Sequence, residues 1–203
     1  MRRLILPLLL LMGWTATAAA HELAIERSLT IQLHASHAEL LLIYSEPPGP
    51  RTDRILALYD SDKDGRISGV EARLARRPML RRAQLGLDVS VNGANTAEKQ
   101  PQVRFRRDES GGIAMATYQR IDFIAQADAI SIDVKLGDVK GTPELQLEVE
   151  SGADWHFPGD DAGRRVTLRP GKTASFAVER TVPEVTTDDS KRRWQPPEKS
   201  RLK

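Results

Sequence analysis

The chain has 203 residues, of which 29% are charged, and its 30 basic and 28 acidic residues leave a formal net charge of +2. It contains no cysteine, which excludes disulfide bonds, thiolate metal sites and a cysteine nucleophile. A charge this close to neutral does not predict nucleic-acid binding.

Residues 1–20 have the pattern of a secretory signal peptide. Arg2 and Arg3 precede an apolar run from Leu4 to Met12, and small residues follow up to Ala20. The run is shorter than the roughly 20 apolar residues that cross a bilayer, and no later stretch comes closer. We therefore expect a periplasmic or secreted protein with no transmembrane segment in its mature part.

Alternation of apolar and polar residues predicts strands along most of the mature chain. Residues 23–33 alternate clearly, and the short aliphatic run at 40–44 completes a hairpin. The two-residue period returns after Gly86 in short segments separated by turn residues, around 87–91, 103–105, 121–123, 130–136, 145–149 and 176–178. This spacing predicts a mainly β fold, an antiparallel immunoglobulin-like β-sandwich, over residues 21–182.

Two short helices are predicted between the second and third strands. Residues 52–59 and 70–83 carry apolar side chains at near-helical spacing, and Pro78 is expected to kink or end the second helix. The result is a helix-loop-helix insertion at about residues 51–85. Residues 183–203 form a polar tail with too few apolar residues to build a core, so we expect them to be disordered.

The loop between these helices reads DSDKDGRISGVE, residues 60–71. Carboxylates occupy its first, third, fifth and twelfth positions, and Gly65 is sixth. Calcium is a hard cation that takes six to eight oxygen ligands, and alternating acids on a tight turn can converge on one point. The loop therefore predicts a site for one Ca²⁺ ion.

This loop resembles the EF-hand family at every defining position. The resemblance implies that Gly65 makes the sharp bend and that Ile67 packs inward. It also implies one oxygen from each of three aspartates, a backbone carbonyl, a contact usually made through water, and two oxygens from a glutamate. In that order these ligands are Asp60, Asp62, Asp64, Arg66, Ser68 and Glu71.

EF-hands usually act in pairs, and the sequence contains no second acidic loop of this kind. A lone loop favours a structural ion over a regulatory one. Extracellular calcium modules work with dissociation constants of about 10⁻⁴ to 10⁻³ M, which suits an exported chain. An alternative is calcium-gated partner binding, in which loss of the ion frees the helix pair.

A second hypothesis concerns copper or nickel. If the leader is cleaved before His21, the free amino group and imidazole of that residue could chelate the metal, with His34, His37 and His156 as candidate second ligands. The chain would then be a periplasmic metal-handling protein in which calcium holds the scaffold.

Three segments, HELAIERSLTIQL, DSDKDGRISGVE and LDVSVNG, occur in an order that distantly resembles the exported part of the HupE/UreJ-type proteins associated with nickel and cobalt transport. That resemblance implies a strand pair, an acidic loop leading into a helix, and a strand ending at an NG turn. His21 is not followed by proline, and no membrane helices follow, so the resemblance concerns architecture more than transport.

Motifs of catalysis are missing from the sequence: it has no G-x-S-x-G, no H-E-x-x-H and no glycine-rich phosphate loop. We therefore predict a non-enzymatic, calcium-stabilised module. Its β-sandwich is expected to present a surface to an envelope or secreted partner protein, and not to nucleic acid.

Overall fold

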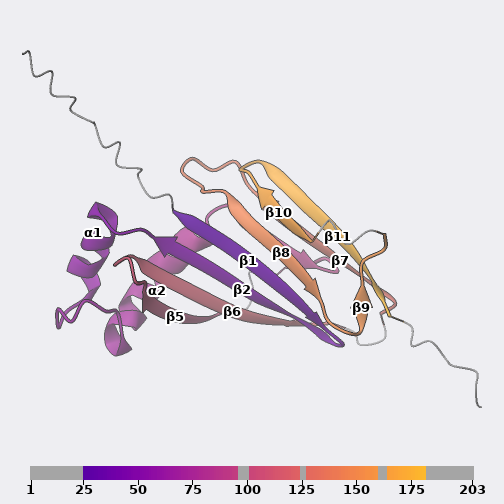
Figure 1. Ribbon diagram of the computed structural model, residues 1–203, viewed down its shortest axis with the longest axis horizontal. Coiled ribbons are helices and arrows are strands. Elements are labelled where there is room, and N and C mark those ends of the chain that lie inside the picture. Colours follow the sequence, from indigo (N-terminus) through magenta and orange to yellow (C-terminus); the bar gives the residue numbers. More distant parts are fainter. Residues whose placement is uncertain (1–24, 96–100, 124–126, 160–163, 182–203) are drawn as a thin grey trace, which may run out of the picture.

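The fold is described by a computed structural model for residues 25–95, 101–123, 127–159 and 164–181 (Figure 1). The predictions for the leader, for His21 and for the tail after residue 182 lie outside these residues. The described part is mainly β, as predicted, with strands in two mostly antiparallel sheets and two helices. None of the described helices is both long and apolar enough to cross a membrane.

The first sheet contains six strands in the order β10-β8-β1-β2-β6-β5. Its elements are β1 (Glu26–His34), β2 (His37–Glu46), β5 (Gln102–Arg107), β6 (Ile113–Asp122), β8 (Leu145–Ser151) and β10 (Arg165–Leu168). The predicted hairpin is confirmed: β1 and β2 pair antiparallel from Glu26 opposite Ser45 to His34 opposite His37. Because side chains alternate between faces, every second residue of β1 is buried.

The second sheet contains five strands in the order β4-β3-β7-β11-β9. Its elements are β3 (Leu87–Val91), β4 (Ala94–Asn95), β7 (Ala129–Leu136), β9 (Trp155–His156) and β11 (Lys172–Arg180). The predicted turn after β3 is also confirmed, since Asn92 and Gly93 have φ values of 50° and 74° and join β3 to β4 in a hairpin.

Buried side chains from both sheets belong to one hydrophobic cluster. The first sheet contributes residues such as Ile31 and Leu147, and the second contributes residues such as Ile132 and Val134, all with no exposed surface. Figure 1 shows the two sheets lying one behind the other, with the helices at one end. The two-residue period thus marks the faces that meet in the core.

The helices α1 (Pro50–Tyr59) and α2 (Gly69–Ala83) lie between β2 and β3 in the chain, where the sequence predicts them. The expectation that Pro78 could end the second helix is wrong, because α2 continues for five more residues to Ala83. Proline removes the hydrogen bond to the carbonyl four residues earlier, that of Leu74. Leu74 lies on the exposed side of α2, where water can donate a hydrogen bond to that carbonyl. Beyond the proline, Met79 and Ala83 are buried.

One strand pair departs from the predicted antiparallel arrangement. β1 pairs with β8 in parallel, with Ser28 opposite Gln146 and Leu33 opposite Ser151. Parallel neighbours require a long crossover connection, and here β8 returns to the first sheet after β7 in the second. The sequence also underestimated β6, which extends from Ile113 and not only over 121–123, and it missed β9 and β10.

Candidate metal centre

The acidic loop joins the two helices and takes one ligand candidate from the end of each. Asp60 follows α1, and its backbone N–H donates to the carbonyl of Leu56 at 2.8 Å. Glu71 lies in the first turn of α2, where it is only 6% exposed. The two helices therefore position the first and last residues of the loop, Asp60 and Glu71.

The bend at the centre of the loop depends on Gly65. This glycine has φ +78°, a left-handed conformation that residues with a Cβ adopt at a cost. Asp60 fastens the bend, since its carboxylate accepts the backbone N–H of Asp64 at 3.1 Å and that of Gly65 at 2.9 Å. The carboxylate of Asp64 in turn accepts the N–H of Arg66 at 2.7 Å. In the first half of the loop, the aspartate carboxylates thus accept hydrogen bonds from the backbone N–H groups that follow them.

Three of the predicted ligands converge. One carboxylate oxygen each from Asp60, Asp62 and Glu71 lies within 4.8 Å of the other two. Calcium–oxygen bonds of 2.3–2.6 Å place ligands on opposite sides of the ion about 4.6–5.2 Å apart, so three oxygens within 4.8 Å of one another are close enough to share one ion. The all-oxygen donor set also suits calcium, and the residues present therefore fit this metal.

The other predicted ligands occupy the second half of the loop or its rim. Asp64 is exposed and its side chain is not part of the converging group. Arg66 is exposed as well, and Ser68 is the N-cap of α2, where its backbone N–H donates to Glu71 Oε2 at 3.3 Å. Ile67 points inward as the resemblance implies, with 8% of its surface exposed.

Electrostatics in the loop favour a cation. For Asp62, the hydrogen bond from Asp64 lowers the pKa, but burial and the negative charges of Asp64 and Glu71 outweigh it, so the pKa of this carboxyl lies above its ordinary value. The pKa of Glu71 is lowered, first by the Ser61 hydroxyl at 2.7 Å and then by backbone N–H groups. A divalent ion would relieve the repulsion that Asp62 feels from Asp64 and Glu71.

Arg107 ties the loop to the first sheet, a contact that the sequence did not predict. Its guanidinium, reaching from the end of β5, donates to the carbonyl of Gly65 at 3.1 Å. No local pattern could reveal this, since 42 residues separate the two partners. The bend is thus hydrogen-bonded both to Arg107, through the carbonyl of Gly65, and to Asp60, through backbone N–H groups of the loop.

No family model matches this chain, and no curated protein matches it.

The histidine candidates fall into separate places. His34 and His37 face each other across the β1–β2 turn, and their nitrogens lie within 4.8 Å of a carboxylate oxygen of Glu39. His156 is on β9 in the other sheet and pairs with Glu179 at 3.6 Å. The sequence did not single out Glu39, which only the hairpin register brings to the two rings.

Proposed function

We propose that residues 60–71 are an EF-hand loop that binds one Ca²⁺ ion. The observation that carries this is the convergence of carboxylate oxygens from Asp60, Asp62 and Glu71 beside the left-handed turn at Gly65. In the bound state the side chain of Asp64, the backbone carbonyl of Arg66 and a water-mediated contact at Ser68 would complete the oxygen shell.

The ion has a structural role in this proposal. The sequence holds a single loop of this kind, and Ile67 and Arg107 already attach it to the rest of the domain. In a periplasmic or secreted location, millimolar calcium would occupy even a site with a dissociation constant of about 10⁻⁴ M. At ten times the dissociation constant the ion adds roughly 1.4 kcal/mol to the free energy of unfolding.

We further propose that the two sheets form an immunoglobulin-like β-sandwich that binds a partner protein. Leu41 and Ile43 support the partner-binding part of this proposal, since they lie on the outer side of β2 with 39% and 36% of their surfaces exposed. A contiguous exposed apolar patch marks a contact surface, and we propose that these two side chains belong to one.

Isothermal titration with Ca²⁺ and Mg²⁺ tests the calcium site. We expect one equivalent of Ca²⁺ to bind and Mg²⁺ to bind more weakly, because Mg²⁺ requires shorter bonds in a rigid octahedron. A Glu71→Ala variant should lose the calcium heat. Calcium binding with undiminished affinity in that variant would show that the ion lies elsewhere.

A further inference from the structure

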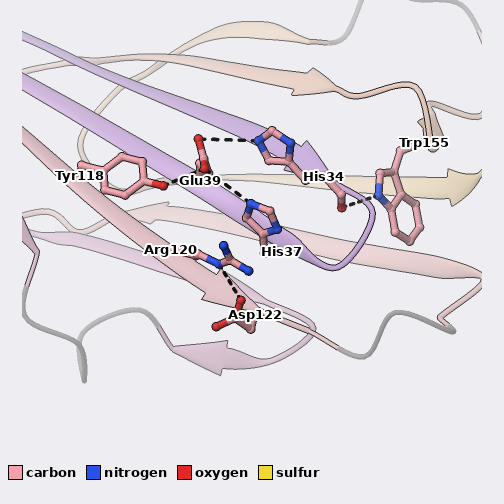
Figure 2. Close-up of polar contacts among 7 residues, drawn as sticks. All are labelled: His34, His37, Glu39, Tyr118, Arg120, Asp122 and Trp155. Atoms are coloured by element: carbon pink, nitrogen blue, oxygen red, sulfur yellow. Dashed lines mark hydrogen bonds and ion pairs between the residues drawn. The ribbon is translucent and has the colours of Figure 1, made fainter.

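A second cluster of metal-ligating side chains lies on the outer face of the first sheet, at the β1–β2 turn (Figure 2). His34 ends β1, His37 begins β2, and the two are directly opposite in the hairpin register. Glu39 lies two residues further along β2 and so points to the same face as His37. The hairpin thus gathers two imidazoles and one carboxylate over six residues of sequence.

The distances within this cluster match those around a small transition-metal ion. The Nε2 atoms of His34 and His37 lie 3.6 and 3.5 Å from the two carboxylate oxygens of Glu39. Metal–ligand bonds of about 2.0–2.2 Å in a tetrahedron separate neighbouring ligands by about 3.3–3.6 Å. The rings are stacked, with centroids 4.5 Å apart and planes 11° from parallel. Since an ion lies in the plane of each ring it binds, one ring must turn about its χ2 angle for both to share it.

The carboxylate of Glu39 is held in place by a neighbouring strand. Tyr118 on β6 donates its hydroxyl hydrogen to Glu39 Oε1 at 2.7 Å (Figure 2). A hydrogen-bonded support of this kind is a regular feature of metal ligands. Arg120, the residue opposite Glu39 on β6, pairs with Asp122 at 2.7 Å, so its positive charge is offset next to the cluster.

The turn itself is also fixed. Trp155 donates its indole N–H to the carbonyl of His34 at 2.8 Å, and Phe123 donates its backbone N–H to the carbonyl of Ser36 at 3.0 Å. The Nε2 atom of His34 and the Nδ1 atom of His37 are buried and lack a hydrogen-bond partner among the described residues. A buried nitrogen without a partner is costly, and a bound metal would satisfy the first of these two.

We propose that His34, His37 and Glu39 bind one divalent transition-metal ion of the Zn²⁺ or Cu²⁺ class, separately from the calcium loop. Two imidazoles and one carboxylate suit these borderline ions, whereas calcium prefers oxygen alone. Three protein ligands leave at least one coordination position for water or an exogenous ligand. The cluster lies at the start of β2, whereas the calcium loop follows α1, which comes after the other end of β2, so the two sites are separate (Figure 1).

Titration of the calcium-saturated protein with Zn²⁺, and in a second arm with Cu²⁺, tests this proposal. We expect one equivalent to bind, with affinity reduced at least ~10-fold in His37→Asn and in Glu39→Gln, since loss of a ligand costs no less than loss of its supporting hydrogen bond. His156→Asn is the matched control, because His156 also lies beside a glutamate but outside the cluster. Equal loss in the control, or unchanged binding in His37→Asn, would overturn the proposal.

Two further variants separate this site from other sources of binding. Tyr118→Phe removes only the support of Glu39, and loss of such a partner typically lowers metal affinity about 10- to 100-fold. His21→Asn should leave Zn²⁺ affinity unchanged, and a loss there would assign the metal to the N-terminus instead. Circular dichroism of each variant, with a melting temperature within a few degrees of the parent, checks that it is folded.

Discussion

The sharpest consequence of the proposed calcium site concerns Asp60. This carboxylate is both a predicted ligand and the acceptor for the N–H groups of Asp64 and Gly65. Asp60→Ala should therefore lower the melting temperature of the calcium-free protein and, in addition, abolish the rise produced by calcium. Only the second effect reports on the ion, so the two must be measured separately.

The size of the calcium effect can be worked out. An ion at ten times its dissociation constant contributes roughly 1.4 kcal/mol. In a domain of this size, 1 kcal/mol shifts the melting temperature by about 2–4 °C, so the expected rise is about 3–6 °C. Differential scanning calorimetry with chelator and with millimolar Ca²⁺ measures it in the parent and the variant.

A matched control for Asp60→Ala is Asp53→Ala, which removes the same charge from the exposed first turn of α1. The control should keep the full calcium-dependent rise. If Asp60→Ala also keeps it, the ion does not sit in this loop and the reasoning from convergent oxygens is refuted.

Four other outcomes follow from the structure. Glu71→Gln should reduce calcium affinity at least ~10-fold in isothermal titration, because a neutral amide offers the ion one oxygen in place of two charged ones. Gly65→Ala should lower the free energy of unfolding by about 1–2 kcal/mol in urea, since its φ of +78° is strained for alanine. It should also weaken calcium binding, whereas Gly93→Ala, with a φ of +74° outside the loop, should leave the affinity unchanged. Burial, and then the hydrogen bond to Glu46, raises the pKa of the Tyr44 hydroxyl. The stability that this shift contributes is complete below pH ~10, the pKa in the unfolded chain, and is lost as the pH rises further. Alkaline unfolding should therefore be less steep with pH in Tyr44→Phe, and an identical slope would contradict this. Hydrogen exchange should show that calcium protects residues 60–71 and leaves the C-terminal half of α2 unchanged, while changes reaching Ala83 would indicate a switch.

The strands that the sequence predicted are those whose two faces differ in polarity. In β1, Leu29, Ile31 and Leu33 alternate with polar residues, and the structure buries all three. β6 was largely missed because Ala114 and Ala116 on its outer side are themselves apolar, so the residues on its two faces look alike in sequence. Local alternation cannot show a strand when neither face is polar.

Pairing between distant segments was beyond the reach of local patterns. The parallel partner of β1 is β8, more than a hundred residues further along the chain. The two candidate metal clusters differ in the same way, since one is local in sequence and the other depends on strand pairing. All the proposed ligands in the acidic loop lie within twelve consecutive residues, so their spacing could be read directly. The support of Glu39 by Tyr118 instead requires the register between β2 and β6, across 79 residues.

Attachment of the helices to the core bears on whether calcium is structural or regulatory. A calcium switch works by letting its helices separate and expose a groove. Here Ile55 of α1 and Ala75, Met79 and Ala83 of α2 belong to the same buried cluster as the sheets, each with at most 4% of its surface exposed. Separating the helices would expose these side chains, at about 25 cal/mol for each Å² of apolar surface. At ten times its dissociation constant the proposed ion would supply roughly 1.4 kcal/mol, enough to order the loop but too little to control the packing of both helices. The anchoring of α2 beyond Pro78 thus favours a structural ion.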